Sequence, residues 1–133
     1  MTFVTMGSER SQLKSLTHLL LSAFPGSVIY QQTNLLRVSE DVQETNVDAV
    51  FLQAEEMDSE EALYILRRWR PELPVFFLAE WGSLSFATSE EDAYCYLPRP
   101  ITGQKLRDAL LWTWQIGEKK QQHLSTMREE EHL

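Results

Sequence analysis

The stretch DAVFLQ, residues 48–53, decides the fold of this chain. Four consecutive apolar residues within it favour a strand that is buried on both faces. Two further apolar runs follow at residues 73–79 (LPVFFLA) and 94–97 (YCYL). Helical or polar segments separate the three runs. Buried strands that alternate with helices predict a parallel sheet covered by helices on both faces.

The same patterns place the remaining elements. We expect strands at residues 2–6, 28–30, 49–53, 75–78 and 94–97. Helices are predicted at residues 9–24, 35–44 and 59–69, and a last helix opens near Thr102, a good N-cap residue. Residues 80–92 are expected to form a loop and a short fourth helix. Five βα units in this length predict an α/β flavodoxin-like fold, a doubly wound parallel five-stranded sheet with order 2-1-3-4-5 and an extended C-terminal helix.

The composition is that of one folded domain. The chain has 133 residues, of which 43% are hydrophobic, and this is enough to bury a core. No apolar run approaches the roughly 18 residues of a membrane span, and the start does not read as a signal peptide. The single cysteine, Cys95, excludes an internal disulfide and fits a reducing compartment. A cytoplasmic location without membrane contact is therefore expected.

The formal charge of −8 argues against direct contact with nucleic acid, because such contact depends largely on neutralising phosphates. The one basic cluster, RRWR at residues 67–70, ends the helix predicted at 59–69. Cations in that place complement the helix dipole. One face of this helix is expected to meet the core, and it carries Ala62, Ile65, Leu66 and Trp69.

Together these runs resemble the sheet of CheY-like receiver domains, the phospho-acceptor module of bacterial response regulators. The resemblance covers residues 1–117, with residues 118–133 left as a C-terminal helical extension or a linker. Residues 86–102 are similar to the corresponding segment of receivers in LytTR-type transcription regulators. The resemblance implies a part in two-component signalling, a phosphorelay or transcription regulation. The chain is then either the receiver half of a regulator, with a DNA-binding output domain beyond this sequence, or a free-standing receiver-like protein.

The phospho-acceptor site of that family is altered in this chain. The family's acceptor aspartate corresponds to Gln53, and a carboxamide cannot form an acyl phosphate. The acidic pair that holds magnesium corresponds to Gly7 and Ser8, which we interpret as a turn and a helix cap. Ala79 replaces the hydroxyl residue that binds the phosphoryl group. The resemblance therefore implies a degenerate receiver that is not phosphorylated, with no metal ion and no cofactor.

Two further positions keep part of the family's chemistry. Arg99 replaces the family's lysine before Pro100, and the bond between them can keep the cis geometry common in receivers. We expect Arg99 to pair with a nearby carboxylate such as Glu55 or Glu80 rather than with a phosphate. Tyr96 corresponds to the aromatic switch residue, and an ordinary half-buried strand tyrosine is an equal alternative.

No other catalytic arrangement is recognisable in the sequence. The histidines are scattered, and none falls at metal-ligand or triad spacing with Cys95. No Gly-rich phosphate loop follows the first strand. We therefore do not expect an enzyme.

The last helix indicates a binding surface. Trp112 and Trp114 lie about 160° apart on a helical wheel, so both cannot lie in the core. One of them is expected on an exposed apolar surface together with Tyr94, Leu111 and Ile116, and such surfaces mark partners. A homodimer or a protein partner is the leading hypothesis, and the alternative is a tail that folds back over this face.

A second class of function stays open. The crevice at the strand ends, around Gln53, Ala79 and Arg99, can serve to sense a small anion or metabolite. An arginine in a site without the family's carboxylates favours this alternative.

Overall fold

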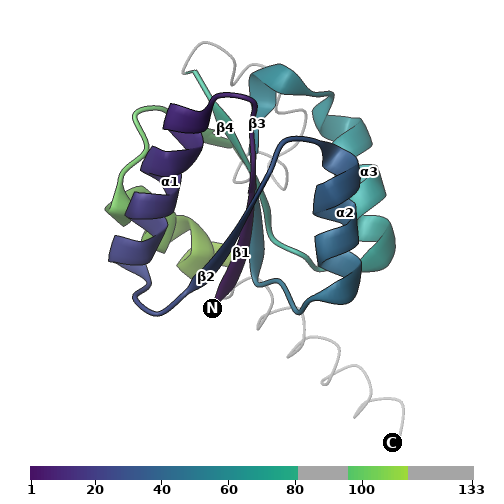
Figure 1. Cartoon of the computed structure of the whole chain (residues 1–133), viewed down its shortest axis with the longest axis horizontal. Coiled ribbons are helices and arrows are strands. Elements are labelled where there is room, and N and C mark those ends of the chain that lie inside the picture. The colour runs from purple at the N-terminus through teal and green to yellow at the C-terminus, as the bar shows by residue number, and fades with distance from the viewer. Residues whose placement is uncertain (81–95, 114–133) are drawn as a thin grey trace, which may run out of the picture.

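The computed structural model describes residues 1–80 and 96–113. The strands within these ranges form one parallel sheet in the order β2-β1-β3-β4-β5 (Figure 1). They are β1 (Thr2–Met6), β2 (Val28–Gln32), β3 (Ala49–Gln53), β4 (Val75–Ala79) and β5 (Tyr96–Pro98). The predicted α/β flavodoxin-like fold and its strand order are confirmed.

Helices cover both faces of the sheet. They are α1 (Arg10–Ala23), α2 (Leu35–Glu44), the short 3-10 helix η1 (Ala54–Glu56) and α3 (Ser59–Trp69). Residues 103–113 are also helical and are called the final helix below. Figure 1 shows α2 and α3 on one side of the sheet, with α1 and the final helix on the other. Among the described residues, no helix is long and apolar enough to cross a membrane.

Two hydrophobic cores hold these layers together. The central strands β3 and β4 are buried along their whole length, as their apolar sequences predict. On one face the strands pack against α2 and α3 through Val38, Val42, Ala62 and Leu66. On the other they pack against α1 and the final helix through Leu16, Leu20, Leu106 and Leu110.

Several predicted boundaries differ from the observed ones. β2 continues to Gln32 and β4 to Ala79, beyond the predicted ends at residues 30 and 78. α1 is one residue shorter at each end, because Glu9 and Phe24 are its caps. β5 begins at Tyr96 within the described residues, whereas residues 94 and 95 lie outside them, as does the expected fourth helix. Thr102 caps the final helix as predicted, since its Oγ1 accepts a hydrogen bond from Lys105 N at 3.2 Å.

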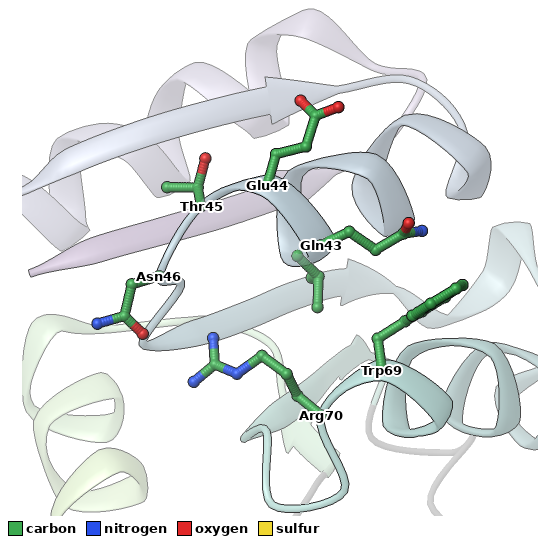
Figure 2. A pocket seen from close by; sticks show the side chains of 7 residues that line it. Gln43, Glu44, Thr45, Asn46, Trp69 and Arg70 are labelled. Atoms are coloured by element: carbon green, nitrogen blue, oxygen red, sulfur yellow. The ribbon is translucent and has the colours of Figure 1, made fainter.

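Trp69 does not lie in the core, in contrast to the sequence prediction. Its side chain is 51% exposed, although Ala62 and Leu66 on the same helix are buried. Trp69 is the last residue of α3, and the next buried position along the chain is taken by Leu73. The indole instead lines a cavity of about 500 Å³ between the ends of α2 and α3 (Figure 2). The Arg68 guanidinium stacks over its ring at 5.9 Å from the centroid.

Candidate functional site

The carboxyl ends of the parallel strands bring the predicted site residues to one edge of the sheet. Gln53 ends β3 and Ala79 ends β4, whereas Arg99 directly follows β5 and Gly7 directly follows β1. In doubly wound folds this edge is where ligands bind. The structure therefore places these residues where the sequence predicted that they would meet.

Gln53 and Arg99 form the centre of the site. Gln53 is 3% exposed, and its Oε1 accepts a hydrogen bond from the Arg99 guanidinium. Arg99 also donates to Glu55 Oε1 at 2.6 Å and Oε2 at 3.2 Å, and to Glu80 Oε1 at 3.3 Å. The two carboxylate partners expected for Arg99 are thus both present. The backbone of Arg99 is fixed as well, because its N–H donates to Ala79 O at 2.9 Å.

Gly7 is in direct contact with Gln53. A Cβ atom at position 7 would lie only 2.8 Å from Gln53 Cγ, closer than such atoms approach in proteins. The same atom would lie 3.5 Å from Leu13 Cδ2, an ordinary contact. The buried glycine therefore makes room for the glutamine, and any side chain at position 7 would compete with it.

Ser8 binds a carboxylate from the loop after β3. Its backbone N–H lies 3.1 and 3.0 Å from the two carboxylate oxygens of Glu56, and its hydroxyl donates to Glu56 Oε1. The predicted cap role of Ser8 is wrong, because Glu9 is the N-cap of α1 and makes no side-chain cap bond. The orphan N–H groups at the start of a helix attract anions, which explains why Glu56 reaches back to this point.

The charged side chains of the site pair with groups of the same chain. The hydrogen bond from Arg99 is the largest cause that holds the pKa of Glu55 below its usual value of 4.5, and burial opposes it. The hydrogen bond to Glu55 likewise raises the pKa of Arg99. Glu55 and Glu80 pair with one guanidinium, and Glu56 binds Ser8 at the end of β1, so the site carries more negative than positive charge.

The Glu55–Arg99 pair predicts a specific pH dependence. The pKa of Glu55 is lower in the folded chain, so ionised Glu55 stabilises the fold above the unfolded-chain value near 4.5. This stabilisation is lost as the pH falls through the lowered pKa. The difference in unfolding free energy between the natural chain and Glu55→Gln should therefore be largest at neutral pH and shrink toward pH 3, as measured by urea denaturation.

Glu40→Gln is the matched control for this experiment. It removes an exposed ion pair to Arg37, in which the side chains are 43% and 64% exposed. Such pairs contribute about 0.5 kcal/mol or less. A difference for Glu55→Gln that stayed constant from pH 7 to pH 3 would contradict the pairing described above.

The remaining predicted site residues are only partly described. Tyr96 is half-buried and stacks on Phe77, with ring centroids 5.3 Å apart. The Arg99–Pro100 bond is cis, as the sequence allowed. On the final helix Leu111 and Trp112 are each 52% exposed. The other predicted members of the partner surface, Tyr94, Trp114 and Ile116, lie outside the described residues.

Two contacts of this site could not be read from the sequence. One is the contact of Gly7 with Gln53, and the other is the bond from Ser8 to Glu56. The only signal for the second was the acidic run after β3, and such a run does not indicate which part of the chain it contacts. In residues 1–80 and 96–113, no group of three or more His, Cys, Asp or Glu side chains is placed to hold a metal ion.

Comparisons with known proteins bear on the fold. No protein-family model and no curated protein sequence matches the chain. Among solved structures, it is similar to a response regulator receiver domain protein from Clostridium thermocellum, with 22% identity and a TM-score of 0.70 over 90% of this chain and 96% of that one.

Two other solved structures agree with this likeness. The receiver domain of an HD domain-containing protein from Pseudomonas fluorescens is 21% identical, with a TM-score of 0.68 over 89% of this chain and 97% of that one. A two-component transcriptional regulator from Clostridium phytofermentans is 15% identical, with a TM-score of 0.69 over 92% and 98%. The chain therefore has the fold of response-regulator receiver domains.

Proposed function

We propose that this chain is a signalling module of the receiver fold that works without phosphorylation and acts by binding protein. The observation that carries the proposal is Gln53, a buried carboxamide at the end of β3 whose oxygen is taken up by Arg99. An amide nitrogen in place of a carboxylate oxygen removes the nucleophile that an acyl phosphate requires.

The neighbours of Gln53 support the same proposal. Gly7 offers no carboxylate to magnesium, and the groups of Ser8 are engaged by Glu56. Ala79 is buried and has no hydroxyl. Phosphoryl transfer depends on oxygen ligands for magnesium and on placed donors, and the side chains at positions 7 and 79 supply neither. We propose a role without enzymatic activity.

Arg99 is already paired with negatively charged groups, as it would be with a bound phosphoryl group. Its guanidinium is bound to Glu55 and Glu80 of the same chain. The ends of β3, β4 and β5 are thereby tied together without an added group. We propose that this edge of the sheet keeps one fixed arrangement. The signalling output of the domain then depends on which partner binds.

The proposed binding surface includes the exposed part of the final helix, where Leu111 and Trp112 lie. Half-exposed large apolar side chains next to each other are typical of protein contacts. Self-association is our leading form of the proposal. The resemblance of residues 86–102 to LytTR-type receivers supports a place in transcription regulation, where an output domain rather than this acidic chain would contact DNA.

Light scattering coupled to gel filtration tests this surface. We expect a dimer whose apparent dissociation constant rises at least about tenfold in Trp112→Ala, because central tryptophans at interfaces contribute roughly 2 kcal/mol or more. Trp69→Ala is the matched control, since Trp69 is equally exposed but lies at the end of α3. A monomer at every concentration, or equal effects of the two variants, would contradict self-association through the final helix.

The alternative of an anion or metabolite sensor finds less support in the geometry. Gln53 and Arg99 line a common cavity, which favours a ligand site. The positive charge of Arg99 is already shared by two carboxylates, however, and Glu56 adds a third nearby. An anion would therefore be repelled unless these carboxylates moved away.

A further inference from the structure

One edge of the sheet is formed by β2. Among the described residues, β2 lies at the end of the strand order and pairs with β1 alone. The helices α1 and α2 lie on either side of the sheet and cover its faces (Figure 1). Helices on the faces do not pair with the backbone at the outer side of an edge strand, which can therefore add a further strand.

Two backbone hydrogen bonds show which residues of β2 face β1. Val28 N donates to Met1 O at 2.8 Å, and Gln32 O accepts from Gly7 N at 3.2 Å. In a paired strand, every second residue directs both its N–H and its C=O group toward the same neighbour. Val28, Tyr30 and Gln32 therefore bond to β1.

The two residues between them direct their backbone groups outward. Ile29 and Gln31 thus present two N–H donors and two C=O acceptors at the edge of the sheet. In residues 1–80 and 96–113, no loop, helix or side chain forms a hydrogen bond with these four groups. Such a row of backbone groups is a template for pairing with another chain.

The sequence of this edge lacks the features that normally prevent such pairing. Residues 27–36 contain no charged residue and no proline, in a chain of which 24% is charged. The register between β1 and β2 runs without a bulge. Natural edge strands are commonly protected by lysine, proline or a bulge, and β2 has none of these. Val28 and Tyr30 are 52% and 38% exposed, so the edge also presents apolar surface.

The charge pattern favours a second copy of this chain as the added strand. A contact between two identical strands has a two-fold axis, so a charged residue at its centre would face its own copy. Residues 27–36 avoid this repulsion because they are uncharged. A strongly acidic or basic peptide, in contrast, would find no opposite charge on this strand.

The outward groups are also self-complementary about Tyr30. In an antiparallel pair, residues opposite each other alternate between hydrogen-bonded and non-hydrogen-bonded pairs. When Tyr30 lies opposite Tyr30 of the second copy, Ile29 of each copy lies opposite Gln31 of the other. Each of these two pairs exchanges two hydrogen bonds, so every outward group of both residues has a partner. The two tyrosines form the non-hydrogen-bonded pair, in which the side chains lie closest.

We propose that β2 pairs in antiparallel orientation with β2 of a second copy, which joins the two sheets into one. The contact is one strand wide on each side, and interfaces below about 1,200 Å² are typically weak and transient. This inference goes beyond the function proposed above and does not rest on it. Self-association through the final helix uses another surface and can fail without affecting the pairing of β2.

Amide hydrogen exchange followed by two-dimensional ¹H–¹⁵N NMR of the full chain tests the pairing residue by residue. We expect the Ile29 and Gln31 amides to exchange at least about threefold more slowly at about 1 mM chain than at about 50 µM, because they are bonded only in the pair. The Val28 and Tyr30 amides should be protected at both concentrations, since they bond to β1 within each copy.

Tyr30→Lys separates this pairing from other contacts. It places two ammonium groups opposite each other at the two-fold axis, and like charges in that position destabilise strand pairing. The concentration dependence at Ile29 and Gln31 should then vanish, while continued protection of the Val28 amide shows that the sheet is intact. Tyr64→Lys is the matched control, because it makes the same change at a 73% exposed tyrosine on α3 and should leave the dependence unchanged.

Three results would each overturn the proposal. Equally fast exchange of the Ile29 and Gln31 amides at both concentrations would mean that the edge has no strand partner. Protection that does not depend on concentration would mean that the edge is covered within one chain. Equal effects of Tyr30→Lys and Tyr64→Lys would mean that net charge, and not the β2 contact, controls the association.

Discussion

Replacing Arg99 with methionine is expected to lower the free energy of unfolding by about 2 to 3 kcal/mol, one of the largest effects at this site. The change removes the donors that bind Glu55 and Glu80 and leaves the buried oxygen of Gln53 without its partner. Methionine keeps the apolar stem of the side chain, so the loss reports mainly on these bonds. Urea denaturation followed by circular dichroism measures it.

Arg37→Met is the control for this change. Arg37 is 64% exposed and pairs with Glu40 one turn along α2, so its loss should cost about 0.5 kcal/mol or less. Equal losses of unfolding free energy in Arg99→Met and Arg37→Met would mean that the hydrogen bonds of Arg99 contribute no more than an exposed surface pair. The arrangement of the strand ends described above would then be wrong.

Gly7→Ala is expected to destabilise the fold by about 1 to 3 kcal/mol, although alanine is normally at least as favourable as glycine at a compatible backbone position. Gly7 has no positive φ angle, so its backbone accepts alanine. The cost comes from the added Cβ, which would lie 2.8 Å from Gln53 Cγ. Because Gln53 is held by Arg99, it cannot move away freely.

A double-mutant cycle isolates this contact. Gln53→Ala removes the Cγ atom, so Gly7→Ala should cost little in that background, with a coupling free energy on the order of 1 to 2 kcal/mol. Gly103→Ala serves as the control, because among the described residues its Cβ would meet only Ala23 Cβ, at an ordinary 3.9 Å. Additive effects of the changes at positions 7 and 53 would show that the two residues do not compete for space.

This contact bears on the proposed loss of phosphorylation. An aspartate at position 7 would bring the same Cβ, and so it would meet Gln53 before it could serve a metal ion. The residues at positions 7 and 53 are thus physically linked. A single substitution at either position would not rebuild the acidic site.

Much of the fold could be predicted because its signals are local. The apolar runs at β3 and β4 are long enough to indicate strands buried on both faces, and both are fully buried in the structure. Because the carboxyl ends of parallel strands lie at one edge of the sheet, the sequence also predicted that Gln53, Ala79 and Arg99 lie close together. The pairing of Arg99 with Glu55 and Glu80 followed from charge and from this shared edge.

Other features depend on contacts between distant residues and left no periodic signal. Ser8 and Glu56 are 48 residues apart, and only the three-dimensional turn of η1 brings the carboxylate to the start of α1. Trp69 has the helical position of a core residue, but it lies at the last turn of α3, where Leu73 fills the core instead. Sequence periodicity shows on which face of a helix a residue lies. It does not show how far the sheet under that helix extends, and so it could not predict that Trp69 is exposed.

We propose that the end of β3 in this chain does not accept a phosphoryl group. Incubation of the full chain with acetyl phosphate and Mg²⁺, followed by intact-mass spectrometry, tests it most directly. The mass is expected to stay unchanged and equal to that of a sample incubated without Mg²⁺. A Mg²⁺-dependent gain of one phosphoryl group would contradict it.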